Sequence, residues 1–264
     1  MSEFRIWKVD DDGNNTALVG GDTGISRCQM PGSTFIKNLI ISINGREVFN
    51  SNQLYPYKTY LDTELSCPKD VKDSFMSCVG YASDGKDQNS VTGEGFQPRH
   101  EYFALSKIAQ FITNIDADLF AQDLYLINNC EVDIEVSPQS DEFMLMQATT
   151  DATTYRLELV NVKLYVKMVE LMDGLSLDLA RRLDAKPARY SMRKSMLKSL
   201  YISEGRYEFN ANIFTDEVPR RVIIGFLEND AFQGSKHKSP FNFKNFGVRD
   251  IAIVANGRNY PQTV

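Results

Sequence analysis

The sequence predicts an all-β protein, mainly antiparallel, with a few short helices. Residues 132–136 alternate Val, Ile and Val with acidic residues, which is the pattern of a strand with one buried and one solvated face. The dipeptides Asn44-Gly45 and Asn256-Gly257 adjoin apolar runs and are the strongest short-range signal of a β-hairpin. Long polar loops separate the short runs, as in architectural β proteins rather than nucleotide-binding α/β enzymes.

The first third of the chain contains one hairpin and two helices by these criteria. Residues 1–34 are rich in Asp, Gly, Asn, Ser and Thr, and we expect them to be loosely ordered. Residues 39–49 form two strands around Asn44-Gly45. A helix is predicted over 57–65, where the apolar spacing is helical and Pro68 follows, and a short second helix over 70–79.

The middle of the chain returns to strands after an exposed polar loop at 83–98. Strands are predicted at the apolar runs 101–105, 110–115, 124–127 and 130–136. A longer strand is predicted over 155–169. Its alternation shifts by one residue at Leu159-Val160, which is compatible with a β-bulge.

The last third begins with a helix over 176–183, where Leu175, Leu179 and Leu183 share one stripe. Strands are predicted after it at 190–200, 206–210, 221–227 and 251–254. These patterns divide the chain into a polar segment 1–34, a first β unit 35–170, a helical joint 171–186 and a partial second β unit 187–264.

Size and composition are those of a globular protein in a reducing compartment. The 264 residues are 42% hydrophobic and 24% charged, enough to bury a core. The net charge of −6 argues against direct, sequence-specific nucleic-acid binding. Four separated cysteines (Cys28, Cys67, Cys78 and Cys130) and the lack of a signal peptide predict reduced thiols and an intracellular location, nucleus or cytoplasm. No run approaches the ~20 apolar residues of a membrane span.

No motif predicts catalysis. Residues 80–87 nearly match a phosphate-binding loop, but Asp87 follows Lys86 where a hydroxyl should hold magnesium. His100 and His237 are far apart and have no neighbours at metal-ligand spacing. Asp116-Ala117-Asp118 fits a turn or helix start better than a cation site. We therefore predict no enzyme activity, no cofactor, and no catalytic or metal-binding residues.

A basic stretch follows the predicted helical joint. It suits phosphate, an acidic neighbouring subunit or simply a solvated face, and it consists of Arg181, Arg182, Lys186, Arg189, Arg193, Lys194 and Lys198. Arg220 and Arg221 likewise fit an intersubunit ion pair or an exposed strand start. These alternatives are open on sequence alone.

Several motifs occur in the same order as in one family of proteins. They are Asn44-Gly45, Tyr55-Pro56-Tyr57 with Tyr60-Leu61, Phe120-Ala121-Gln122-Asp123, Pro219-Arg220-Arg221-Val222-Ile223-Ile224-Gly225, Asn229-Asp230-Ala231-Phe232, Gly234-Ser235 and Pro240-Phe241-Asn242-Phe243-Lys244. So arranged, the chain resembles a group of largely uncharacterised animal proteins linked to Maverick/Polinton-type virus-like elements and related DNA viruses. The likeness covers residues 36–261 and is most specific over 219–261.

The resemblance implies a capsid-type structural protein. Such elements are similar to viruses whose capsid proteins are jelly rolls, often two per chain and assembled as trimers. It implies self-association, contact with other capsid proteins and a place in the virion if the element is active. The alternative is a host-retained β-sandwich binding module that holds a protein partner with the 83–98 loop or the aromatic loop 232–246.

Two departures from the family concern the ends of the chain. Family members carry further strand sequence before the part matched by Phe35 and continue beyond the part matched by Tyr260-Pro261. This chain has an acidic start and stops at Val264. We therefore expect a truncated double jelly roll that self-associates, with strands 39–43 and 251–254 left exposed.

Overall fold

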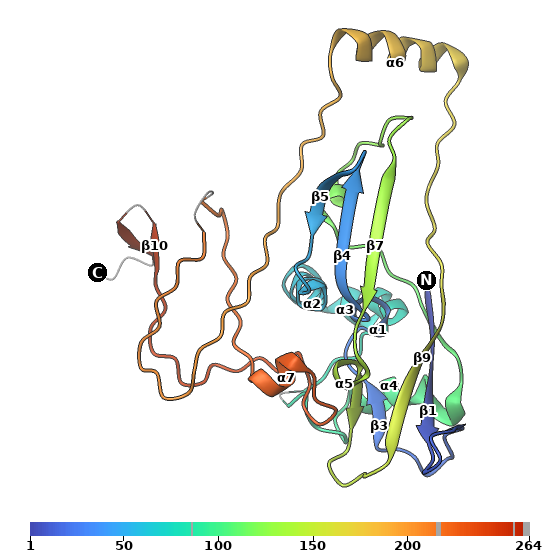
Figure 1. Cartoon of the computed structure of the whole chain (residues 1–264), viewed down its shortest axis with the longest axis vertical. Helices are drawn as coiled ribbons and strands as arrows, with labels where there is room; N and C mark the ends of the chain where they lie inside the picture. Colours follow the sequence, from blue (N-terminus) through green and yellow to red (C-terminus); the bar gives the residue numbers. More distant parts are fainter. Residues whose placement is uncertain (86, 215–217, 256, 261–264) are drawn as a thin grey trace.

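A computed structural model describes residues 1–85, 87–214, 218–255 and 257–260. Figure 1 shows a β-rich body made by the first 162 residues, with extended segments and a detached helix after it. The named strand pairs are all antiparallel, and the helices are short. The predicted class, mainly antiparallel β with a few short helices, is confirmed at this level.

The central strand of the first sheet is β1 (Ser2–Val9). It pairs with β9 (Thr154–Val162) along its whole length, and with β2 (Asn15–Thr16) and β6 (Ala109–Phe111). Phe4 and Ile6 alternate with half-exposed residues and are buried. The expected loose order is therefore wrong for residues 2–9, because a short apolar alternation is hidden in a polar composition.

The second sheet has the strand order β5–β4–β7. The strands are β4 (Ile36–Ile43), β5 (Arg46–Asn50) and β7 (Val132–Pro138). Asn44 and Gly45 both have positive φ, 50° and 74°, so the predicted hairpin turn is confirmed. Strand 39–43 is not an exposed edge as expected, because β7 covers its other side and Leu39 and Ile41 are buried.

A separate two-stranded sheet pairs β3 (Ile25–Arg27) with β8 (Leu145–Gln147). α4 (Phe96–Glu101) packs against β3, and α5 (Asp141–Met144) lies against β8. α1 (Pro31–Thr34) contacts β6, and two 3₁₀ turns, Ala104–Ser106 and Asp118–Ala121, contact β1 and β5. The predicted strand at 101–105 is wrong, since this segment is the end of α4 and a turn in which Leu105 has φ 57°. The run 124–127 also forms no strand.

The helix α2 (Tyr55–Ser66) confirms the helix predicted over 57–65. Pro56 suits the first turn, where its missing N–H needs no partner, and Pro68 stops the helix. Its buried face carries Tyr55, Tyr57 and Tyr60. The second predicted helix is split into α3 (Lys69–Asp73) and a 3₁₀ helix over Phe75–Val79.

The predicted bulge at Leu159-Val160 is confirmed. Phe4 lies opposite Leu159 and Glu3 opposite Asn161, so Val160 is the extra residue. The strand ends at Val162, however, and not at 169. The next segment is extended without a strand partner among the described residues, and it leads to α6 (Asp173–Ala185), which confirms the predicted helix over 176–183.

The second β unit differs most from expectation. Residues 190–200, 206–210 and 221–227 form no strand within the described part of the chain. That part contains α7 (Asn229–Gln233) and one hairpin, β10 (Ile253–Ala255) with β11 (Arg258–Tyr260). Asn256 of the predicted turn lies outside the described residues. β10 pairs only with β11 there, and Val254 is exposed as expected. Among the described helices, none is long and apolar enough to cross a membrane.

Candidate assembly surface

The outer edge of β9 and the segment after it form an exposed apolar strip, which we call the 159–169 edge. Eight of its eleven residues are large apolar side chains that are 39–85% exposed: Leu159, Val160, Val162, Leu164, Tyr165, Val166, Met168 and Val169. The backbone of Lys163 exchanges two hydrogen bonds of 2.9 Å with Met1. No backbone hydrogen bond is described from there to Val169. Such an edge carries unpaired N–H and C=O groups beside apolar side chains.

The first half of β9 is better covered. The Leu157 N–H donates to Asp141 Oδ2 at 3.2 Å, and the Tyr155 carbonyl accepts from Lys236 Nζ at 3.4 Å. The body of the protein thus protects the lower part of this strand. The unprotected edge begins at Leu159 and continues along the side of the body towards α6 (Figure 1).

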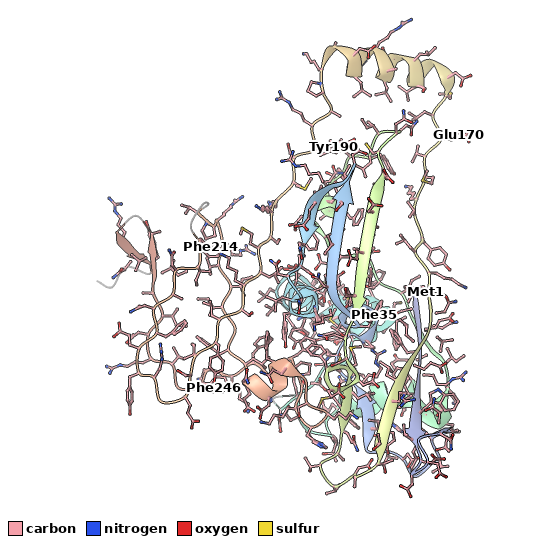
Figure 2. The ribbon with its side chains drawn as sticks, in the orientation of Figure 1. Met1, Phe35, Glu170, Tyr190, Phe214 and Phe246 are labelled. Atoms are coloured by element: carbon pink, nitrogen blue, oxygen red, sulfur yellow. The ribbon has the colours of Figure 1, made fainter. Side chains whose placement is uncertain are left out.

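The segments that return from α6 contact the body at few points. Tyr190 Oη donates to the Tyr125 carbonyl at 3.1 Å and accepts from the Ile127 N–H at 3.0 Å. Asp118 accepts two hydrogen bonds from Ser195. Figure 2 shows Phe214 on such a returning segment and Glu170 on the segment that leads into α6, while Phe35 lies among the side chains of the body. Further exposed apolar residues follow, among them Leu200, Tyr201, Ile223 and Ile224.

The aromatic loop 232–246 is anchored to α2. Phe241 is 1% exposed and stacks on Tyr60 with ring centroids 4.5 Å apart. Phe232 stacks on Tyr57 at 5.5 Å. Phe246, at the far end of the loop, is 52% exposed and projects into solvent (Figure 2), and Phe232 is 37% exposed. This loop therefore uses most of its aromatic surface to attach the C-terminal segment to the body.

Polar contacts support the same anchor. Asn89 Oδ1 accepts from the Ser239 N–H at 2.7 Å, which ties this loop to the 83–98 loop. Glu228 pairs with Lys244 at 2.6 Å and with Lys238 at 3.0 Å. Hydrogen bonds from Lys244 and Lys238 lower the pKa of the Glu228 carboxyl, because they favour its charged form.

The 83–98 loop is held from inside the protein. Arg99 donates two hydrogen bonds of 3.0 Å to the carboxylate of Asp84, and both side chains are buried. Gln29 binds the backbone of Ala82 on both its N–H and its carbonyl. Lys86 lies outside the described residues. The buried carboxylate of Asp84 occupies the middle of the sequence that resembled a phosphate-binding loop, and α4 begins only at Phe96.

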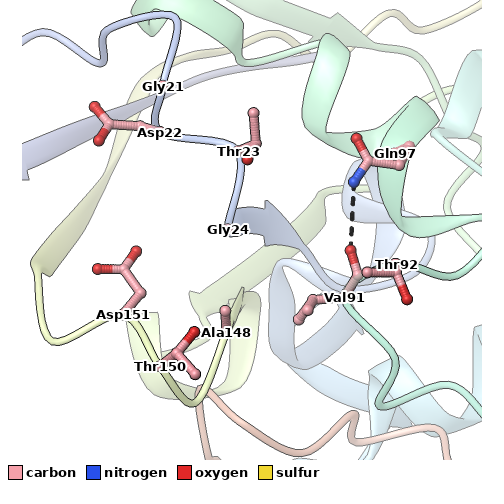
Figure 3. Close-up of a pocket in the computed structure, with 10 residues that line it drawn as sticks. All are labelled: Gly21, Asp22, Thr23, Gly24, Val91, Thr92, Gln97, Ala148, Thr150 and Asp151. Atoms are coloured by element: carbon pink, nitrogen blue, oxygen red, sulfur yellow. Dashed lines mark hydrogen bonds between the residues drawn. The ribbon is translucent and has the colours of Figure 1, made fainter.

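A shallow pocket of about 480 Å³ lies beside this loop (Figure 3). Its carboxylates are already engaged: Asp22 accepts from Lys8 and from the Val19 N–H, and Asp151 from Tyr155 and the Thr153 N–H. The remaining lining is mainly Gly and Thr, and Gln97 donates to the Val91 carbonyl. This lining presents no His, Cys, Lys or Arg that would serve as a catalytic group.

The candidate metal residues lie apart. His100 Nδ1 is 2.7 Å from the Ile25 carbonyl, and His237 Nδ1 is 3.0 Å from the Gln147 carbonyl. Asp116 pairs with Lys58 at 2.6 Å. Asp118 begins a 3₁₀ helix, which confirms the helix-start interpretation. Within the described ranges, no group of three or more His, Cys, Asp or Glu side chains is placed to hold a metal ion.

Charge is divided unevenly along the chain. Residues 1–162 contain 12 Lys and Arg against 24 Asp and Glu, whereas residues 163–264 contain 17 against 11. The seven residues of the basic stretch are exposed, and Arg182 pairs within α6 with Asp178 at 2.9 Å. The acidic body and the basic extended segments therefore have opposite net charge, a distribution suited to contacts between copies.

The chain is similar to an uncharacterized protein of Caenorhabditis elegans. The two are 31% identical over 230 residues, which is 86% of this chain and 54% of the nematode protein. The chain thus spans about half the length of this relative. No known family profile matches the chain, and no solved structure matches it.

Proposed function

We propose that the chain is a structural protein that assembles with copies of itself, of the capsid type implied by its resemblance to proteins of Maverick/Polinton-type elements. On this proposal the β sheets belong to a jelly-roll architecture, with trimers as the assembly unit. The protein acts by association and without catalysis, in the nucleus or cytoplasm and then in a virion where the element is active.

The observation that carries the proposal is the exposed apolar surface of the extended segments. Contiguous exposed apolar patches on soluble proteins mark sites of association. Burying one large apolar side chain contributes about 1.5–3 kcal/mol. The eight side chains of the 159–169 edge are 39–85% exposed, so burying their exposed parts contributes about 7–14 kcal/mol, which is of the same size as the ~4–15 kcal/mol that association costs in lost freedom. A second copy that buries the same edge adds as much again, so association is favoured over exposure of these segments to water.

The alternative, a host-retained binding module, has less support. It relied on the 83–98 loop and the aromatic loop 232–246 to hold a partner. The 83–98 loop is held to the body by the ion pair between Asp84 and Arg99, and the aromatic loop 232–246 buries Phe241 against α2. The exposed aromatic side chains left to meet a partner are Phe246 and part of Phe232.

The proposal is tested by the size of the purified protein. Light scattering after size-exclusion chromatography, followed by negative-stain electron microscopy, should show oligomers or particles of this chain, and the same measurement on the longer nematode relative should show regular assemblies. The matched control is this chain with Leu164 and Val166 both changed to Lys, which adds charge to the exposed edge without touching the core. A wild-type chain that stays a monodisperse, cooperatively melting monomer at every concentration tested would refute the proposal.

A further inference from the structure

The 159–169 edge carries few of the devices that normally protect an edge strand, namely the bulge at Val160 and two lysines. Natural sheets blunt such edges with Pro, with frequent charges or with a covering helix or loop. The sequence from 159 to 169 contains no Pro and no Gly, and its only charged residues are Lys163 and Lys167. Among the described residues, β1 and Met1 pair with its inner side as far as Lys163. Beyond that residue no backbone pairing is described, and Lys167 Nζ lies 5.5 Å from the centre of the Tyr125 ring.

We propose that this edge pairs in antiparallel fashion with the same edge of a second copy, around a two-fold axis at Val166. The two first sheets then join into one continuous sheet across the dimer. The inference deepens the proposed function and rests on it, because it takes self-association as given and assigns one contact, between trimers. A two-fold contact at a single edge joins two copies and does not close a ring of three. A two-fold contact of this kind is self-complementary, so one surface serves both partners.

The register follows from the side chains. A two-fold axis at a residue places even-numbered side chains of both copies on one face, and here these are Val162, Leu164, Val166 and Met168. With the axis at Val166, Leu164 of one copy faces Met168 of the other. Lys163 then faces Val169, and Lys167 faces Tyr165. An axis at 165 or 167 instead sets Lys opposite Lys, and an axis at 164 sets Glu158 opposite Glu170. Like charges directly opposite each other destabilise a strand pair.

The described part of the same chain offers no equivalent partner strand. The most apolar extended segment, 221–227, is held on the other side of the molecule. The Lys244 N–H donates to the Phe226 carbonyl at 3.0 Å, and Gly225 lies against the ring of Phe243. Figure 1 places this segment beyond α2 and α7, away from β9. A second copy brings the matching edge without moving that anchor.

Cysteine cross-linking tests the register directly. Paired residues in antiparallel strands have Cα atoms ~4.5–5.5 Å apart, within the range of a disulfide. Val166→Cys in a chain with Cys67, Cys78 and Cys130 changed to Ser should form a disulfide-linked dimer on mild oxidation. Val19→Cys in the same background is the control, because Val19 is 61% exposed and Val166 66%. A dimer yield for Val166→Cys no higher than for the control would overturn the register.

A proline variant tests the contact itself. Val166→Pro removes one N–H and restricts φ outside any described ladder, so the body should fold as before, with an unchanged circular dichroism spectrum. We expect the dissociation constant to rise at least tenfold, whereas Tyr207→Pro, at a fully exposed position, should leave it unchanged. Assembly that Val166→Pro does not weaken overturns this inference and leaves the proposed function standing. A wild-type chain that never associates overturns both. Dimers lost in Val166→Pro, without larger particles from wild type, support this contact and count against the capsid role.

Discussion

Replacing Arg27 with Met should stabilise the protein. Arg27 on β3 is completely buried, and its Nε, Nη1 and Nη2 atoms have no hydrogen-bond partner among the described residues. The guanidinium carbon lies 4.0 Å from the centre of the Phe4 ring, its nearest compensation. Buried cations are normally paired or hydrogen-bonded, since removal from water is costly. Methionine fills a similar shape without a charge.

The pKa of Arg27 gives the size of the stability gain expected for Arg27→Met. Burial lowers it from 12.5 to about 10, and each pKa unit corresponds to ~1.4 kcal/mol, so the charged form costs about 3 kcal/mol in the folded state. A cation–π contact contributes about 0.5–2 kcal/mol, some of which is lost with the charge. The net gain for Arg27→Met is therefore about 1–3 kcal/mol. Because the folded pKa lies below the ordinary value, the cost is present throughout neutral pH and fades only as pH rises above about 10.

Urea denaturation at several protein concentrations measures this gain and separates it from self-association. Arg27→Lys is the matched control, since it keeps the charge and should not stabilise. A Met variant more than ~1 kcal/mol less stable than wild type would show that the guanidinium is well compensated, and the reasoning would fail.

Three further predictions concern the anchor and the loop that it contacts. Phe241→Ala should lower the free energy of unfolding by about 3–4 kcal/mol, because it leaves a buried cavity. Phe246→Ala, at an exposed position, should change that free energy by less than ~0.5 kcal/mol. Equal effects in urea denaturation would contradict the packing described. Gly95→Ala should lower the free energy of unfolding by about 1–3 kcal/mol and speed proteolysis of the 83–98 loop, because the new Cβ would lie 2.3 Å from a carboxylate oxygen. Gly85→Ala is the control, because that position has open space. Equal proteolysis rates in the two variants would count against this prediction. The pKa of Glu228 is lowered, so its ion pairs stabilise the fold above its ordinary pKa of 4.5 and are lost as pH falls below that value. The melting temperature should therefore drop more between pH 7 and pH 4 in wild type than in Glu228→Gln, by the equivalent of about 0.5 kcal/mol. Equal drops in the two proteins would refute the assignment.

Local signals predicted local structure well. The Asn44-Gly45 turn needs positive φ at two successive residues, and few other dipeptides accept it. The helix α2 has helical apolar spacing and a proline beyond its end. The bulge at Val160 was visible because one extra residue reverses the alternation of a long strand.

Long-range pairing was beyond the sequence pattern. The short alternation around Phe4 and Ile6 does not reveal that β1 is the centre of a sheet, because its partner β9 lies about 150 residues away. The run 221–227 is as apolar as a core strand, yet it has no ladder in the described chain. Period-2 alternation predicts that a segment will be extended with one face buried, but the identity of the strand beside it depends on the fold or on another copy.

The sequence also predicted only part of the assembly surface. The sequence predicted a strand through residue 169, and the structure pairs it only to Val162. The signal that identifies the edge is the apolar content beyond Val162 combined with the loss of a partner. The apolar content can be read from the sequence, whereas the loss of a partner strand is seen only in the structure.

The position of β1 has a consequence for synthesis in the cell. Trp7 is hydrogen-bonded to Glu158, 151 residues later. At the usual ~5–20 residues per second, the ribosome needs roughly 8–30 s to produce β9 after β1. During that interval the future centre of the sheet has one long side open to other nascent chains. Non-local pairing of this kind slows folding and exposes aggregation-prone strands, so the yield of folded protein should depend on chaperone supply and fall when many ribosomes translate one message.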